Sequence, residues 1–584
     1  MKRIKNLYRK LVAAVVLASG LFATSCTDYL TIIPPSVVVH ENFWRTEAEV
    51  NGMVATAYLT MFSSSAMRSS IIWGETRAET VAMRTGLTDD HIEYLMEGLL
   101  YDDNSYAPWT QYYNVINNCN LVLEFGPQVM EHDPNFTEGD MQIVEGQMLA
   151  LRAMAHFYLV RAFCDIPLAT TAVMTDAAIP EYFQVNPFEA LNAAYADLEK
   201  ASRLVLKSGY TSNGYITTNA VYALMADIDM WRAAFSAYYS DPNHADEGIT
   251  PEFTANEYYD KAIANCERIM SEMQKVLDEE EEKMGITQKR YPYDLIPNDG
   301  EVKQIEHGYS RAYNEIFGDN NSSESIFEFQ IDDKNYEKNN HGYAAVFSTE
   351  GKSEGAILVV QKNFLDTYFA EDDLRKYAFT TFKKVEDPKE SGKDIAAVKY
   401  TAKTTAMDES GSRTFRTYSE FDANWIVYRK PEIMLMLAEA LVSRKGLGDA
   451  VMEPAVAKAI NLTNTVHNRW IMDTIKSKKP LSFTGSNIED KRVSCLQNVR
   501  DERARELCFE GKRWYDIVRM ALQGEDTDFS YKNKTTTDPE EMLRRYNHIS
   551  AYFMPIAKDE IRFNKNLHQN KSCRSSEESA ITKK

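Results

Sequence analysis

Charged side chains recur near the C-terminus, where Glu510, Arg513, Asp516 and Arg519 are each three residues apart. This pattern could serve catalysis, or it could form ion pairs along one face of a helix. Glycoside hydrolysis needs two carboxylates about 5 to 10 Å apart across a cleft, and spacing along the chain cannot show that arrangement. Side chains three residues apart are neighbours on a helix. We therefore interpret the run as a structural ion network on a packed helix.

Motifs for metal and phosphate chemistry are missing from the sequence. There is no HExxH segment and no phosphate-binding P-loop. The seven cysteines include no CxxC pair. An EF-hand-like start at Asp319, Asn321 and Ser323 fails, because Glu324 and Gln330 occupy the positions that need Gly and Glu. We therefore expect no metal site and no cofactor.

The charge balance excludes one class of partner. The 584 residues contain 65 Lys and Arg against 86 Asp and Glu, which gives a net charge of −21. A chain this acidic is repelled by phosphate backbones. We therefore expect no nucleic-acid partner.

The N-terminal segment resembles a bacterial lipoprotein signal. Basic residues open the chain, and an apolar stretch from Leu11 to Ala23 follows, which is shorter than the ~20 residues that span a bilayer. The stretch ends in Ala23-Thr24-Ser25-Cys26, which resembles a lipobox, although Ala23 stands where Leu is usual. The sequence predicts a signal peptide over residues 1–25 and lipidation of Cys26. A plain signal peptide with an incidental Cys is the alternative.

Apolar residues at helical spacing predict a mostly α-helical fold beyond the anchor. The segments form about four antiparallel pairs, which suggests a tetratricopeptide-like solenoid. Residues 285–424 interrupt the third pair and are rich in Gly, Asn, Asp and Lys, with short alternating stretches such as Ile326–Phe329. We expect this insertion to form a loop-rich second layer with short strands. The predicted helices are 108–125 with 145–164, 187–198 with 217–239, 258–277 with 431–442, and 454–470 with 498–520.

Five sequence segments resemble the SusD/RagB-like nutrient-binding lipoproteins of the Gram-negative outer membrane. The clearest is Val499–Asp516, which reads VRDERARELCFEGKRWYD. Two departures are Cys164, where the family usually has Gly, and Ala557, where it usually has Pro. The other segments are Glu41–Glu49, Leu151–Leu168, Tyr428–Ala440 and Met554–Asn570.

The resemblance divides the chain into consecutive parts. After the signal peptide, residues 26–40 are expected to be the anchor and linker. Residues 41–284 would form the N-terminal helical part and 285–424 the insertion. Residues 425–570 would form the C-terminal helical part, and 571–584 a polar tail.

The resemblance implies a binding protein and not an enzyme. Members of that family lie on the cell surface over a TonB-dependent, SusC-like outer-membrane transporter and capture oligosaccharide, glycan or peptide for import. The implied partners are that transporter, a glycan ligand and the outer membrane through the lipid anchor. A peptide ligand and a lipid-anchored glycan hydrolase are the alternatives.

By analogy with the family, the ligand site draws on two loops, Met83–Tyr94 and Asp332–Phe347. Their aromatic rings can stack on sugars or peptide side chains, and their polar groups can hydrogen-bond hydroxyls or amides. Three aromatic residues in the second loop favour a glycan, and neither loop contains a Trp. The candidate ligand-binding residues are Arg84, Asp90, His91, Tyr94, Tyr336, Asn340, His341, Tyr343 and Phe347.

Two further expectations concern the core. Trp73 and Trp109 lie at helical positions and are expected to be buried. The six cysteines after Cys26 are expected to be mostly small buried residues without a functional disulfide.

Overall fold

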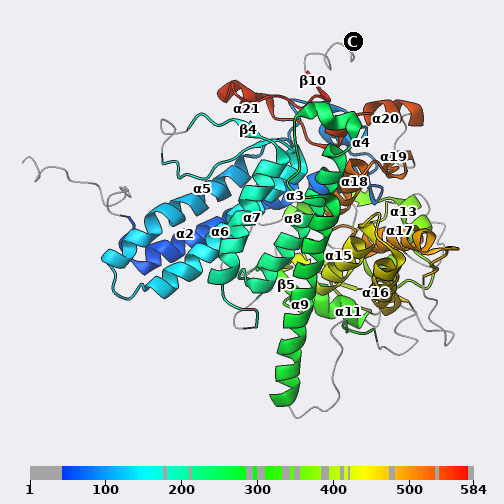
Figure 1. Cartoon of the computed structure of the whole chain (residues 1–584), viewed down its shortest axis with the longest axis horizontal. Coiled ribbons are helices and arrows are strands. Elements are labelled where there is room, and N and C mark those ends of the chain that lie inside the picture. Colours follow the sequence, from blue (N-terminus) through cyan, green and yellow to red (C-terminus); the bar gives the residue numbers. More distant parts are fainter. Residues whose placement is uncertain are drawn as a thin grey trace, which may run out of the picture.

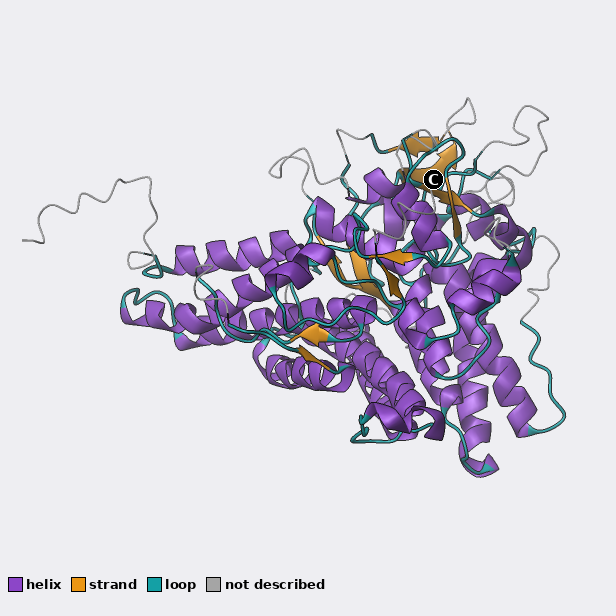
Figure 2. Cartoon of the chain, turned by 90° about the horizontal axis from the view of Figure 1, so that it is seen from above, coloured by secondary structure: helices purple, strands orange, loops and turns teal. Residues whose placement is uncertain are grey.

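The computed structural model describes residues 43–174, 180–209, 213–283, 294–298, 310–331, 342–347, 355–382, 394–407, 413–417, 421–471, 481–532 and 538–575. The signal peptide and Cys26 lie outside these residues. Helices dominate the described chain, and strands occur as short pieces between them (Figures 1 and 2). The predicted mostly α-helical class is confirmed.

The N-terminal helical part contains four of the predicted helices, α5 to α8, in their expected order. Helix α6 packs against both α5 and α7, and α7 packs against α8 (Figure 1). The first two predicted pairs are therefore confirmed. The helices are α2 (Glu47–Met61), α3 (Ser64–Glu75), α4 (Asp90–Met96), α5 (Thr110–Phe125), α6 (Glu138–Phe163), α7 (Pro187–Leu204), α8 (Thr218–Tyr239) and α9 (Ala255–Lys283), with 3₁₀ turns η3 (Gly126–Glu131) and η5 (Pro242–Glu247).

Helix α2 begins within the sequence segment ENFWRTEAE. The Glu49 backbone N–H donates to Thr46 Oγ1, and the Thr46 backbone N–H donates to the Glu49 carboxylate at 2.8 Å. This capping box satisfies two donors that a helix start leaves unpaired. Just before it, Trp44 is buried against Phe125 of α5, with ring centres 5.9 Å apart. The motif thus fixes both the start of α2 and its contact with α5.

The C-terminal helical part completes the third and fourth pairs. Helix α15 packs on α9, and α16 packs on α17. The helices are α15 (Lys430–Ser443), α16 (Asp449–Trp470), α17 (Ile488–Leu507), α18 (Arg513–Leu522), α19 (Phe529–Lys532), α20 (Pro539–Arg545) and α21 (Lys558–Phe563), with the 3₁₀ turn η8 (Ile549–Tyr552).

The prediction of one helix over residues 498–520 is wrong. The chain breaks between α17 and α18, where Phe509 and Gly511 have φ angles of 65° and 67°. The break lets the Gly511 carbonyl approach α3 so closely that a Cβ on Gly74 would lie 1.9 Å from its oxygen. Two glycines therefore let the turn after α17 cross α3.

The strands of the described chain form five two-stranded ladders, and three of them, β1 with β6, β2 with β10 and β5 with β9, join segments far apart in the sequence. The expected strand around Ile326–Phe329 is confirmed as β5. The ladders are β1 (Val81–Met83) with β6 (Leu358–Val360), β2 (Leu100–Tyr101) with β10 (Cys573–Arg574), β3 (Ile166–Pro167) with β4 (Gln184–Val185), β5 (Ser325–Phe329) with β9 (Trp425–Arg429), and β7 (Ala402–Met407) with β8 (Arg413–Phe415). The insertion also holds α11 (Arg311–Tyr313), the π-turn η6 (Asn314–Gly318), α12 (Gly342–Phe347), α13 (Lys362–Tyr368) and α14 (Arg375–Ala378).

One continuous apolar core joins both helical parts and the insertion. Trp73 and Trp109 are buried in it, as expected, and Trp73 Nε1 donates to the Tyr106 carbonyl at 2.6 Å. Four cysteines are buried, and two, Cys164 and Cys573, are half-buried. The buried four are Cys119, Cys266, Cys495 and Cys508.

Within the described ranges, no helix has the length and apolar character needed to cross a bilayer.

Candidate functional site

The structure brings the first predicted loop close to Gly342–Phe347, the described end of the second. Residues 83–94, which we call the β1 loop, leave strand β1, and β1 pairs with β6. The Arg84 backbone N–H donates to the Ile357 carbonyl at 3.1 Å, and the Ile357 N–H donates to the Val346 carbonyl at 2.8 Å. Val346 lies at the end of the second predicted loop. Two backbone hydrogen bonds through Ile357 therefore link Arg84 of the β1 loop to Val346.

The start of the β1 loop is held by the insertion. Arg84 Nε donates to the Ala356 carbonyl at 3.0 Å. Thr85 donates to the Asp394 carboxylate through both its backbone N–H, at 2.9 Å, and its hydroxyl, at 2.8 Å. These contacts fix the position of Arg84, so its guanidinium is only partly available to a ligand.

Helix α4 positions the other candidates of the β1 loop. Asp89 caps the helix by accepting from the backbone N–H groups of its first turn and also accepts from the Tyr106 hydroxyl at 2.8 Å. Asp90 is exposed, and His91 and Tyr94 are half-buried. Tyr94 packs edge-on against Tyr101 with ring centres 4.8 Å apart.

His91 has an open hydrogen-bonding position. Its carbonyl accepts from Asn104 Nδ2 at 3.0 Å. Its ring atom Nδ1 is buried and has no hydrogen-bond partner among the residues that the structure describes. Buried polar atoms in proteins are nearly always paired with protein, water or ligand. This nitrogen is closed to solvent, so a ligand or water reaches it only if the ring of His91 turns outward.

The expected exposure of Tyr343 and Phe347 is wrong. Both side chains are only 1% exposed. The Tyr343 ring lies 4.9 Å from that of Tyr400 and 5.8 Å from that of Trp425, and Phe347 packs edge-on against Phe509. These residues form α12, which packs on α3, so their rings are core and cannot stack on a surface ligand. The candidates Tyr336, Asn340 and His341 lie outside the described residues.

The most exposed aromatic rings of the described chain lie elsewhere. Phe563 is 79% exposed and Phe183 is 61% exposed. They come from distant segments that meet where Asn564 Nδ2 donates to the Tyr182 carbonyl at 2.9 Å. Neither ring was among the candidate residues, because the sequence around a Phe does not show whether its ring is exposed. They are the aromatic faces of the described surface that are most open to a partner.

Two hollows lined by described residues were considered as ligand sites. A groove of about 420 Å³ between α9 and α16 is lined mainly by charged and amide groups, including Glu267 and Lys458. A polar cavity beside Trp425 and Arg161 leaves only about 20 Å³ for the centre of a water molecule, enough for about one water. Neither has the size together with the aromatic lining that a bound sugar ring needs.

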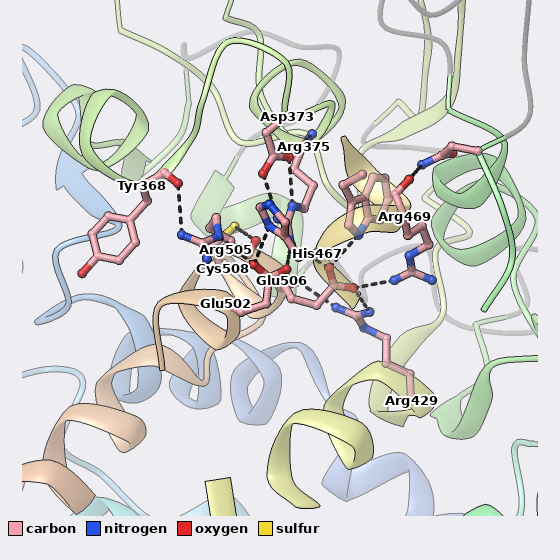
Figure 3. Close-up of polar contacts among 12 residues, drawn as sticks. Tyr368, Asp373, Arg375, Arg429, His467, Arg469, Glu502, Arg505, Glu506 and Cys508 are labelled. Atoms are coloured by element: carbon pink, nitrogen blue, oxygen red, sulfur yellow. Dashed lines mark hydrogen bonds and ion pairs between the residues drawn. The ribbon is translucent and has the colours of Figure 1, made fainter. Parts of the chain in front are cut away.

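A buried charge network fixes the C-terminal helices to the insertion (Figure 3). Glu506 of α17 accepts from Arg469 Nη2 at 2.7 Å and from Arg375 Nη1 at 3.0 Å. Arg375 also contacts Glu502 at 2.6 Å, and Arg429 contacts Glu510 at 2.8 Å. All these side chains are almost fully buried.

The network balances its own charges. Burial raises the pKa of Glu506, but the surrounding guanidinium groups lower it further, and the net pKa lies below its ordinary value of 4.5. Burial lowers the pKa of Lys399, and the carboxylate of Glu510 at 2.7 Å partly restores it. Each buried charge thus has an opposite charge beside it, which is the condition for burying it at acceptable cost.

The expected structural role of the C-terminal charges is confirmed, but most of their predicted partners are wrong. Only Asp516 with Arg519, at 2.7 Å, forms the expected pair along one helix. Glu510 pairs with Arg429 of β9. Arg513 pairs with Glu79, which follows α3, at 2.7 Å. The break after α17 moves Glu510 off the helix face that the prediction assumed.

No group of three or more His, Cys, Asp or Glu side chains suited to a metal ion lies in the part of the chain that the structure describes.

Both halves of the chain match known family models. Residues 28–230 match the family described as "Starch-binding associating with outer membrane", and residues 398–572 match the SusD family. Two relatives from Formosa agariphila, SusD-like proteins P38 and P2, are 23% and 24% identical to this chain. The alignments cover 89% and 86% of this chain and 92% and 90% of those proteins.

Solved structures share the fold over nearly the whole chain. A SusD homolog from Bacteroides thetaiotaomicron has a TM-score of 0.61 and 21% identity, covering 91% of this chain and 99% of its own. The surface glycan-binding protein A from the same organism, solved with laminarihexaose, has a TM-score of 0.57 and 18% identity, covering 90% and 99%. At these identities the likeness establishes the fold.

Proposed function

The chain belongs to the SusD/RagB-like family, and on that premise we propose that it is a surface lipoprotein of the outer membrane that captures oligosaccharides or polysaccharides. It passes them to a partner TonB-dependent, SusC-like transporter for import. The observation that carries the proposal is that both halves of the chain match models of this family, one of which is described as starch-binding and associated with the outer membrane.

The geometry of the β1 loop supports a binding role. Asp90 is exposed, and the side chain of His91 beside it is half-buried. Carboxylate and imidazole groups hydrogen-bond sugar hydroxyls, and the anchoring of Arg84 and Thr85 holds the loop in place before a ligand arrives. A preformed loop of this kind binds without paying for its own ordering.

Calorimetry of the purified chain against a panel of glycans and peptides tests the proposal. We expect binding to at least one glycan and no product release from any of them. Asp90→Ala and His91→Ala should each weaken binding by about 1 kcal/mol, the usual contribution of one hydrogen bond. Binding of peptides alone, or turnover of a glycan, would overturn the proposal.

A matched control locates the site. Phe563→Ala removes the most exposed aromatic ring of the described chain at a surface formed by other segments. Its glycan affinity should equal that of the unchanged protein. A loss of glycan affinity in Phe563→Ala, with no loss in His91→Ala, would place the site away from the β1 loop. It would still agree with glycan capture.

The transporter partnership needs a separate experiment. The chain should co-purify with a TonB-dependent transporter from membranes solubilised in mild detergent. Recovery of the free monomer alone in several mild detergents would contradict the partnership. It would not bear on the proposal of glycan binding.

A further inference from the structure

The small cavity beside Trp425 and Arg161 lies where the two parts of the chain that match family models meet. One side of it is formed by residues of α3, α6 and α8, and the other by residues of β9, α15 and the turn after α17. The first group falls within residues 28–230 and the second within residues 398–572. Polar side chains from both groups line the cavity. It is therefore a polar gap in the contact between the two parts.

Arg161 of α6 brings a buried guanidinium to the cavity. The residue is 8% exposed, and its guanidinium carbon lies 4.3 Å from the ring centre of Tyr158 and 4.6 Å from that of Tyr515. Its Nε is buried and has no hydrogen-bond partner among the described residues. Its Nη1 lies 3.6 Å from Asp227 Oδ2, which is longer than a hydrogen bond. Arg161 therefore has a donor that the described protein leaves unused.

Glu510, in the turn after α17, brings an acceptor in the same condition. Its Oε1 lies 2.8 Å from Arg429 Nη2 and 2.7 Å from Lys399 Nζ. Its Oε2 is buried and has no hydrogen-bond partner among the described residues, and Lys512 Nζ is 3.5 Å away from it. Glu510 therefore has an acceptor that the described protein leaves unused.

The residues around the cavity hold these two groups close to one another. The Tyr428 hydroxyl donates to Asp227 Oδ2 at 3.0 Å, beside Arg161. Lys512 Nζ lies 5.8 Å from the centre of the Tyr428 ring and 3.5 Å from Glu510 Oε2. About 20 Å³ of the cavity is open to the centre of a water molecule, which is room for about one. The unused donor and the unused acceptor therefore belong to residues that line one water-sized space.

A neutral molecule that both accepts and donates hydrogen bonds fits this lining. The positive charges of Arg161 and Lys512 disfavour a cation, and the carboxylates of Asp227, Glu432 and Glu510 disfavour an anion. Buried waters typically make about three hydrogen bonds to polar groups that would otherwise be unsatisfied. We propose that the cavity binds one water molecule, which accepts a hydrogen bond from Arg161 Nε and donates one to Glu510 Oε2.

Lys512 supplies a third contact for this water. Two of its three protons are directed to the Val427 carbonyl, at 2.8 Å, and to Glu432, at 2.6 Å. The third can be donated to a water between Lys512 and Glu510. The water then links α6 to the turn after α17, so the buried charge network reaches the N-terminal helices through it. This role concerns the scaffold and stands or falls independently of glycan binding.

A crystal structure of the full chain, at a resolution that shows ordered waters, tests the site. We expect one density peak in the cavity, at about 2.7 to 3.2 Å from both Arg161 Nε and Glu510 Oε2. An empty cavity, or a direct hydrogen bond between the two side chains, would overturn the proposal. Contacts of about 2.3 to 2.6 Å from the peak to several oxygens would also overturn it, because such distances identify a metal cation.

Nuclear magnetic resonance gives a readout in solution. With isotope-labelled arginine, the Arg161 Nε–H should show a nuclear Overhauser effect to water whose laboratory-frame and rotating-frame signals have opposite signs, the mark of a water that stays bound. Direct exchange of the proton with solvent gives the same sign in both. The Arg161 signal is assigned by its disappearance in Arg161→Lys.

Arg375 supplies the matched control within the same chain. Its side chain is also buried, but its Nε donates to Asp373 Oδ1 at 3.0 Å, so the Arg375 Nε–H should show no effect from water. An Arg161 signal that lacks the effect in the same way would overturn the proposal. If Arg161→Lys fails to fold, the density in the crystal of the unchanged protein decides the question, since that measurement needs no variant.

Discussion

Replacing Tyr343 distinguishes a core residue from a ligand contact. The sequence places Tyr343 in a binding loop, where Tyr343→Ala would weaken glycan affinity and leave stability unchanged. The structure places its ring among Phe347, Tyr400 and Trp425, with the two nearest ring centres at 4.9 Å. On that evidence the substitution should destabilise the fold, and any effect on ligand binding should be indirect.

The size of the loss follows from the packing. Truncating a large buried aromatic side chain to Ala costs about 3 to 5 kcal/mol, because burial is lost and a cavity remains. The unfolding entropy is about 2.1 cal/mol/K per residue, so for 584 residues it is about 1.2 kcal/mol/K. Tyr343→Ala should therefore lower the melting temperature by about 2 to 4 °C if the body unfolds as one unit.

Tyr343→Phe supplies the matched comparison. The Tyr343 hydroxyl is buried and has no hydrogen-bond partner among the described residues, and an unsatisfied buried polar group costs about 1 to 3 kcal/mol. Removing only that oxygen should leave the melting temperature unchanged or raise it. Both variants are compared by calorimetry, with glycan affinity measured at a temperature where each is folded. Unchanged melting of Tyr343→Ala together with weaker glycan binding would refute the reasoning.

Four further predictions test other features. Glu506→Gln should cost about 3 to 5 kcal/mol in denaturant unfolding, since it leaves buried guanidinium groups uncompensated; a loss under 1 kcal/mol would contradict the network's importance. The pKa values of Glu506 and Glu510 lie below 4.5. Their charged carboxylates should therefore stabilise the fold fully above about pH 4.5 and less as the pH falls further. A melting temperature that stays constant from pH 5 to pH 3 would argue against this. Cys164→Gly should raise stability by about 1 kcal/mol, because φ 68° and ψ −84° suit Gly; a lower melting temperature would show that the thiol's contacts outweigh the strain. Cys26→Ala should release the protein from membranes, and mass spectrometry should find an acylated Cys26 in the unchanged protein.

The first two helix pairs could be predicted because each is formed by helices that are neighbours in the sequence. Apolar residues at helical spacing mark α5, α6, α7 and α8, and neighbouring helices in the chain pack as neighbours in space. The break after α17 could not be predicted in the same way. It depends on the approach of Gly511 to Gly74, more than four hundred residues earlier in the chain. The sequence around either glycine does not indicate that contact.

The exposure of single side chains was the weakest part of the prediction. Tyr343 and Phe347 lie in a segment rich in polar residues, which suggests an exposed loop, yet the short helix α12 turns both rings into the core. Phe183 and Phe563 have similar polar surroundings and remain exposed. Contacts with α3 bury Tyr343 and Phe347, whereas Phe183 and Phe563 lie where two distant segments meet. The local sequence encodes neither arrangement.

The buried charges tie the loop-rich insertion to the C-terminal helices. Arg375 in the insertion contacts Glu502 and Glu506 on α17, and Arg429 at the end of β9 contacts Glu506 and Glu510. An apolar contact surface of the same size would allow small shifts, whereas paired charges lose several kcal/mol when a partner moves away. The same insertion carries β6, whose ladder with β1 sets the start of the β1 loop. Through β6, the charge network on α17 therefore helps to hold the start of the β1 loop in place.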